Sequence, residues 1–127
     1  MHEIIQPEGL WDPRPIFAQV VRSGDQVFIA GQTSVDKNGQ TVGEGDIEAQ
    51  TSQVFDNLDT ALRSVGATFD DVVNLTVYCT DLDTQLPTVA AYRSRYFSEP
   101  VVSTTLQVSR LVRPEWLLEI EAAVVLS

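Results

Sequence analysis

Cysteine, histidine and lysine are almost absent from this chain of 127 residues, and each scarcity removes a class of function. Cys79 is the single cysteine, so an intrachain disulfide and a Cys-x-x-Cys redox motif are excluded. His2 is the single histidine, which excludes a Ser-His-Asp triad and a zinc site built from histidines. Chemistry would therefore use carboxylates, hydroxyls, backbone amides or water, and we expect no metal and no cofactor.

Basic residues are scarce as a group. Eight Lys and Arg residues face 18 Asp and Glu residues, which gives a formal net charge of −10, and Lys37 is the only lysine. Nucleic-acid phosphates require clustered basic side chains, so we expect no nucleic-acid partner. No apolar run approaches the ~18 residues that a membrane span needs, and the N-terminal residues lack the pattern of a secretory signal. These features predict a cytoplasmic protein that does not bind membranes.

The sequence does contain a regular succession of short strands and two helices, in one domain that spans residues 1–127. A hairpin turn at Ser23-Gly24-Asp25 and a second turn at 36–40 separate the early strands. The alternation of apolar and polar residues predicts strands at 16–22, 26–32, 73–80, 101–108 and 117–126.

The clearest helix runs from Ile47 to Val65, where apolar residues recur every three or four positions. Asp46 suits its N-cap, and Gly66 suits the position just beyond its end. A second helix is expected at 84–97, on the condition that Pro87 lies in its first turn. The order β-β-(β)-α-β-α-β-β predicts an α+β fold with one mixed sheet and both helices on one face. The other face is partly apolar, which favours a homo-oligomer that buries it.

The last strand carries two carboxylates in an otherwise apolar run, WLLEIEAAVVL. Glu119 and Glu121 share one face of this strand, and burial of a carboxylate is costly unless it meets water or hydrogen-bond donors. Two interpretations remain open. Both glutamates face solvent, or one is a pocket carboxylate whose pKa is raised by burial and which acts as a general acid or base.

Three segments carry a resemblance that covers the chain from about Phe17 to Leu126: QVFIAGQTSVD, DIEAQTSQVFDNLDTALRSVGATFDDVVNLTVYCTDLD and LLEIEAAVV. They resemble the reactive intermediate deaminase family, called RidA and formerly YjgF. The resemblance implies a chorismate-mutase-like fold and a homotrimer with small-molecule clefts between adjacent subunits. It also implies hydrolysis of small enamines or imines, such as 2-aminoacrylate, with release of ammonia.

The family's site residues transfer to this chain position by position. The glutamate that orients the attacking water matches Glu121, and the ligand-binding glycine matches Gly31, with Ala30 beside it. The aromatic position of the first strand is Phe17, without the hydroxyl that is common there. The polar position of the second helix is Val89. Trp116 and Trp11 are expected to pack or to form a wall of the cleft.

The family's arginine that grips a substrate carboxylate has no counterpart in this sequence. Depending on the register, its place is taken by Ser103 or by Val102, and Arg110 is too far along the chain to substitute. A hydroxyl cannot replace a bidentate charged pair. Thr105 stands two positions beyond Ser103, and both hydroxyls are candidate hydrogen-bond donors to a substrate as well as ordinary strand residues. We therefore expect little hydrolysis of 2-aminoacrylate.

Three functions follow from the resemblance and this departure. The first is an enamine or imine hydrolase whose substrate lacks a free carboxylate or has it bound elsewhere, with catalysis by Glu121, Ser103 and Thr105. The second is a related small-molecule enzyme that uses Glu121 for proton transfer in tautomerisation, condensation or cyclisation. The third is a ligand-binding trimer without catalysis. Ribonuclease activity, which is sometimes attached to the family's name, is disfavoured by the net charge of −10.

Overall fold

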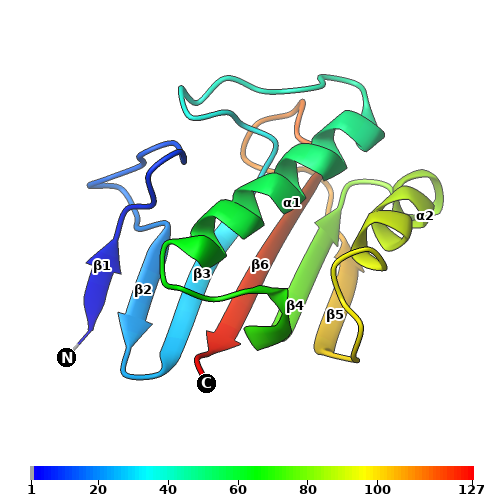
Figure 1. Ribbon diagram of the computed structural model, residues 1–127. Helices are drawn as coiled ribbons and strands as arrows, with labels where there is room; N and C mark the ends of the chain where they lie inside the picture. The colour runs from blue at the N-terminus through cyan, green and yellow to red at the C-terminus, as the bar shows by residue number, and fades with distance from the viewer. Residues whose placement is uncertain (1) are drawn as a thin grey trace.

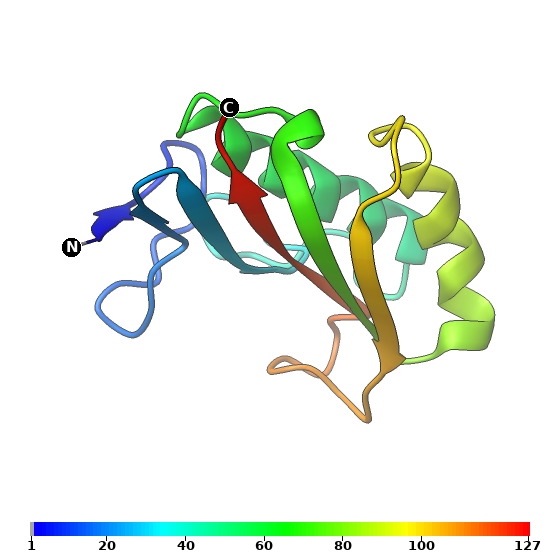
Figure 2. The same cartoon turned by 90° about the horizontal axis from the view of Figure 1, so that it is seen from below.

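The structure, a computed structural model, describes residues 2–127, which form one mixed sheet of six strands with two α-helices on one face (Figure 1, Figure 2). In spatial order the strands are β1 (Glu3–Ile5), β2 (Val20–Ser23), β3 (Gln26–Gln32), β6 (Leu118–Val125), β4 (Val72–Cys79) and β5 (Val102–Gln107). Neighbouring strands run antiparallel except β4 and β5, which are parallel and joined through α2. The predicted α+β fold is confirmed.

Helix α1 (Ile47–Arg63) begins where the sequence predicts. The N–H of Ala49 donates to Asp46 Oδ1 at 3.1 Å, so Asp46 is the N-cap. The helix ends two residues earlier than expected, and Gly66 adopts a left-handed φ of 72° in the turn that follows. No helix within residues 2–127 is both long enough and apolar enough to cross a membrane.

Helix α2 (Leu82–Arg93) starts earlier than predicted and places Pro87 in its second turn, so the condition on Pro87 is wrong. Two side chains explain the earlier start. Gln107 Oε1 accepts from the N–H of Leu82 at 2.9 Å, and Gln85 Oε1 accepts from the N–H of Asp81 at 2.9 Å. These bonds satisfy amides at the helix start that would otherwise lack partners.

The N-terminal strands also differ from the prediction. The first predicted strand, at 16–22, is confined to β2 at Val20–Ser23, because Pro13 and Pro15 form a turn in which Ile16 N–H donates to Pro13 O at 3.0 Å. β1, at the edge beside β2, was not predicted, and the optional third strand before the first helix does not form. Residues 33–46 contribute only the isolated bridge between Val35 and Thr41 around the predicted turn.

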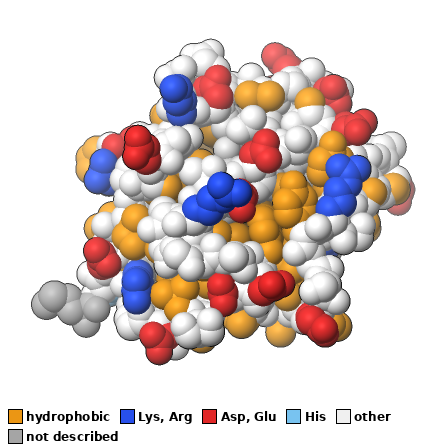
Figure 3. Space-filling view, in the orientation of Figure 1, with side chains coloured by type: hydrophobic (Ala, Val, Ile, Leu, Met, Phe, Trp, Pro, Cys, Tyr) orange, Lys and Arg blue, Asp and Glu red, His pale blue; other side chains and the backbone are white. Residues whose placement is uncertain are grey.

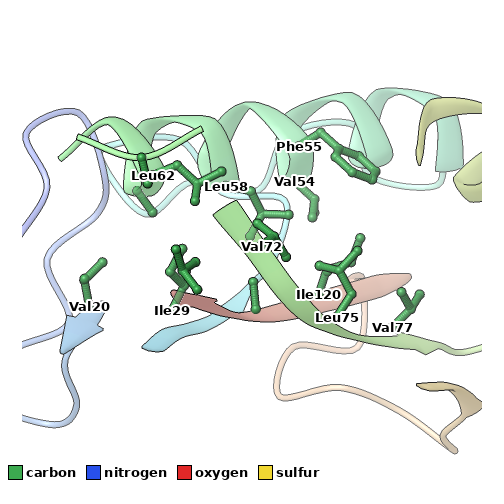
Figure 4. Packing of buried hydrophobic residues seen from close by; sticks show 14 of the residues in the cluster. Val20, Ile29, Val54, Phe55, Leu58, Leu62, Val72, Leu75, Val77 and Ile120 are labelled. Carbon is green, nitrogen blue, oxygen red and sulfur yellow. The ribbon is translucent and has the colours of Figure 1, made fainter. Parts of the chain in front are cut away.

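The core lies between α1 and the sheet (Figure 4). Phe55 is 0% exposed and stacks on Tyr96, with ring centroids 4.7 Å apart and ring planes at 4°. The buried face of β6 supplies four residues that are at most 6% exposed: Leu118, Ile120, Ala122 and Val124. The alternation of β6 therefore puts Glu119 and Glu121 on the opposite face, as the sequence predicted.

The face of the sheet that the helices leave uncovered, which we call the open face, carries apolar and acidic side chains together. Phe28, Val102 and Val125 expose 45–68% of their surface there. On the helix-bearing side, acidic side chains are spread over the surface with few basic ones between them (Figure 3).

Candidate functional site

Three loops meet at one end of the sheet and enclose a cavity of about 380 Å³, a size within the range of small-molecule sites. They are the loop before β2, the loop from β3 to α1, and the loop from β5 to β6. The two last-named loops lie side by side in Figure 1. The apolar walls of this cavity, which we call the tryptophan cavity, are Trp11, Phe17, Val35, Val112 and Trp116.

Buried glutamines hold Trp11 in place. Gln32 Nε2 donates to Gln19 Oε1 at 2.8 Å, and Gln19 Nε2 donates to Trp11 O at 3.0 Å. Both glutamines are at most 5% exposed, so these amides are satisfied mainly by each other and by the backbone. Phe17 meets the Trp11 ring edge-on, with centroids 6.3 Å apart. The loop before β2 is therefore a fixed wall of the cavity.

Gln50 of α1 fixes the opposite wall. Its side chain is 0% exposed; its Nε2 donates to Glu115 O at 2.9 Å, and its Oε1 accepts from the N–H of Leu117 at 2.9 Å. Between these two residues, Trp116 donates through Nε1 to Thr41 Oγ1 at 3.2 Å. The Trp116 ring is thus held by bonds to α1 and to the loop after β3.

Glu119 is the carboxylate of the tryptophan cavity, and it lies directly against Gly31. A Cβ atom at position 31 would stand 2.6 Å from Glu119 Cδ, which is closer than real atoms approach. The register of β3 on β6 shifts between Ile29 and Gln32, and this irregularity places Gly31 beside Glu119. Gly31 therefore provides the space that the carboxylate occupies.

Burial raises the pKa of Glu119 above its usual value, and the nearby charge of Glu121 raises it further. Both causes act against the ionised form. A carboxylate with a raised pKa is a stronger base than an exposed glutamate, and it accepts a proton more readily near neutral pH.

Glu121, the predicted catalytic residue, lies elsewhere. Its Oε1 accepts from the Tyr78 hydroxyl at 2.7 Å on the open face, and this bond raises the pKa of Tyr78. It lines a second hollow beside Phe28 and Thr76 and does not line the tryptophan cavity. Glu119 is thus the glutamate that shares the cavity with the predicted glycine, and the catalytic role of Glu121 stays a prediction.

The other predicted site residues divide into two groups. The structure brings four together in the tryptophan cavity: Phe17, Ala30, Gly31 and Trp116. Ser103 and Thr105 lie on β5 opposite Leu75 and Val77 of β4, so they point to the helix side, away from Glu119 and Glu121. A single chain therefore does not unite these hydroxyls with either glutamate.

Val89 requires a correction. It is 1% exposed and belongs to the hydrophobic core under α2, so it cannot contact a ligand. The surroundings of Ser103 also differ from expectation, because Arg93 of α2 donates through Nη1 to Ser103 Oγ at 2.8 Å. A cation is thus present beside position 103, although the strand itself carries none. Val102, the other register for the missing arginine, is exposed on the open face.

Arg113 was not predicted as a site residue. It lines the tryptophan cavity from the loop between β5 and β6. Its guanidinium carbon lies 4.8 Å from the centre of the Trp116 ring. Within residues 2–127 no group of three or more His, Cys, Asp or Glu side chains is arranged to hold a metal ion.

Known proteins share this arrangement of elements. The sequence profile of a family described as endoribonuclease L-PSP matches residues 11–126. The chain belongs to the RidA (YjgF-type) family. A RutC family protein of Pyrococcus horikoshii is 33% identical over 124 residues, which cover 96% of each chain. This membership confirms the family resemblance predicted from the sequence.

Solved structures of the family agree closely with the fold. RidA from the Antarctic bacterium Psychrobacter sp. superposes with a TM-score of 0.87 at 28% identity, and covers 98% of this chain and 99% of its own. A Rid family protein of unknown function from Yersinia pestis gives a TM-score of 0.90 at 26% identity, covering 99% of this chain and 100% of its own. Both alignments span essentially the whole domain.

Proposed function

We propose that this RidA-family chain hydrolyses an enamine or imine in the tryptophan cavity, with Glu119 orienting and deprotonating the attacking water. The observation that carries the proposal is the position of Glu119, a carboxylate of raised pKa, against Gly31 in a cavity with mainly aromatic and aliphatic walls. The other polar side chains that line this cavity are Gln19, Gln32, Thr33 and Arg113. A largely apolar cavity with one carboxylate base suits attack of water on a C=N carbon.

The proposed reaction balances without a cofactor. An enamine first accepts a proton on its β-carbon and becomes the iminium ion. Water then forms a C–O bond to the iminium carbon while Glu119 accepts a water proton. Glu119 returns that proton to the nitrogen of the resulting amino alcohol, the C–N bond breaks, and ammonia leaves with the bonding electron pair. The hydroxyl group loses its proton to the released ammonia, so that the products are a ketone and an ammonium ion. Glu119 returns to its ionised form at the end of the cycle.

The homotrimer that the resemblance implies is part of this proposal. The exposed apolar side chains of the open face, Phe28, Val102 and Val125, favour burial against further copies of the chain. Val102 lies on this open face, whereas Ser103 and Thr105 point to the helix side, so the proposal assigns these two hydroxyls no role in the reaction.

The proposal is tested by measuring how fast imines disappear. An amino-acid oxidase forms these imines in situ from amino acids. We expect the wild-type protein to accelerate imine loss and Gly31→Ala to slow it about 10- to 100-fold, because the new Cβ displaces the Glu119 carboxylate. Gly31 has no left-handed φ, so this variant strains no backbone.

Gly45→Ala is the matched control. It introduces strain at a left-handed φ of 76° but meets open space, so we expect slight destabilisation with unchanged turnover. Absence of acceleration by the wild type across small, branched and aromatic imines would overturn the proposed function. Equal turnover by Gly31→Ala and the wild type would show that Glu119 has no part in the proposed reaction.

A further inference from the structure

We infer that Arg113 binds the anionic group of the ligand, and that the tryptophan cavity selects carboxylates attached to an aromatic group over small carboxylates. This inference rests on the proposed function and names the substrate class of the same cavity. Arg113 and Glu119 both line this cavity, from the loop between β5 and β6 and from β6 itself.

The guanidinium of Arg113 is held in one orientation. Its Nη1 donates to Gly39 O at 2.8 Å and lies 3.5 Å from Thr41 Oγ1. Its carbon stands over the Trp116 ring at 4.8 Å and over the Trp11 ring at 6.0 Å. Arg113 therefore needs little ordering when a ligand arrives, which favours binding.

One edge of this guanidinium remains available. Within residues 2–127, Arg113 Nε and Nη2 make no hydrogen bond to the protein, and no carboxylate oxygen lies within ion-pairing distance of Arg113. The pKa of Glu115 is lowered by hydrogen bonds to its carboxylate from its own backbone N–H and from Thr41, whose Oγ1 donates to Oε2 at 2.9 Å, and to a smaller extent by the charge of Arg113. The Nε–Nη2 edge presents two parallel donors, the geometry that matches a carboxylate.

The surroundings of the Nε–Nη2 edge indicate that Arg113 binds an anion from outside the chain. A half-buried guanidinium against aromatic walls has lost part of its hydration, and an anion from outside the chain restores a partner for it. The chain as a whole carries a net charge of −10 and repels anions, so Arg113 is the local feature that attracts one.

The aromatic walls of the tryptophan cavity indicate the chemistry of the part of the ligand that Arg113 does not bind. Trp11, Phe17 and Trp116 offer flat apolar surfaces, which pack best against a ring. No ion pair joins Arg113 to Glu119 within residues 2–127. A ligand held by Arg113 through its carboxylate thus leaves Glu119 free for the reacting carbon, while its ring lies among the tryptophans.

Tryptophan fluorescence tests this inference without turnover, because Trp11 and Trp116 are the only two tryptophans and both line the cavity. The probes are phenylacetate, its neutral amide phenylacetamide, and acetate, which lacks the ring. We expect saturable quenching by phenylacetate, with about 10- to 100-fold weaker binding of the other two.

Arg113→Gln should weaken phenylacetate binding by the same factor and leave phenylacetamide binding unchanged, which also shows that the variant is folded. Arg110→Gln is the matched control, because it removes the same charge from the same loop. Among the described residues, 2–127, the Arg110 side chain donates only to the carbonyls of Leu111 and Val112. Arg110→Gln should bind phenylacetate like the wild type.

Undiminished phenylacetate binding by Arg113→Gln, or equal binding of phenylacetate and phenylacetamide by the wild type, would overturn the inference. These outcomes are independent of the proposed function. Failure to hydrolyse imines leaves the binding preference standing, whereas hydrolysis with equal kcat/KM in the wild type and Arg113→Gln contradicts the role of Arg113 and leaves the proposed function intact.

Discussion

Glu119→Gln is expected to lower kcat for imine hydrolysis by about 10²- to 10⁴-fold, the usual contribution of a positioned general base. The amide fills the same space against Gly31 but cannot accept a proton from water. Glu121→Gln is the matched control, because it changes the neighbouring glutamate of the same strand face. Its amide oxygen still accepts from the Tyr78 hydroxyl, so we expect most of the wild-type turnover to remain.

Unfolding of the Glu119→Gln variant would not explain its loss of kcat. The pKa of Glu119 is raised by burial, so the folded state disfavours its ionised form, and this penalty disappears as pH falls through the raised pKa. The variant should therefore be at least as stable as the wild type at neutral pH, with the difference vanishing in acid. If Glu121→Gln were inactive and Glu119→Gln active, the general base would be Glu121 and not Glu119.

Phe55→Ala is expected to lower the free energy of unfolding by about 3–5 kcal/mol, as measured for large aromatic residues deleted from cores. Phe55 is 0% exposed and joins α1 to Phe69 and Tyr96 through ring contacts at 6.2 Å and 4.7 Å. The substitution leaves a cavity beside the rings of Phe69, in the segment before β4, and Tyr96, in the segment after α2. Urea unfolding followed by circular dichroism measures the change.

Phe17→Ala is the control for this second prediction. Phe17 is 44% exposed in a loop, so its loss should cost less than about 1 kcal/mol of stability. The same substitution should weaken phenylacetate binding, since Phe17 lines the tryptophan cavity. A stability loss in Phe55→Ala no larger than that in Phe17→Ala would mean that the ring cluster does not hold α1 on the sheet.

Local patterns were sufficient to predict most of the fold. The spacing of apolar residues from Ile47 and the capping side chain of Asp46 determine α1, and strict alternation determines the buried face of β6. The start of α2 was mispredicted because it depends on Gln107, which is distant in the sequence and satisfies the amide of Leu82. The late start of β2, at Val20, depends on the turn that Pro13 and Pro15 create.

The site was harder to predict because its residues come together through long-range contacts. Glu119 and Glu121 lie on the same face of β6, so the alternation of the strand does not distinguish them. The register shift of β3 beside Gly31 decides which of the two carboxylates enters the cavity. Arg113 lies in a loop whose course depends on Gln50 and Thr41, so no local motif marks it. Val89 was misplaced because its helix buries that position in the core.

The dependence of kcat/KM on pH in the wild type and in Glu121→Gln tests most directly whether Glu119 is the working base. We predict that activity in the wild type falls in acid with an apparent pKa above the usual glutamate value of 4.5. Glu121→Gln removes a charge that raises the pKa of Glu119, so its acid limb should move to lower pH while activity persists. An acid limb that stays in place, or an inactive Glu121→Gln, would contradict the assignment of Glu119.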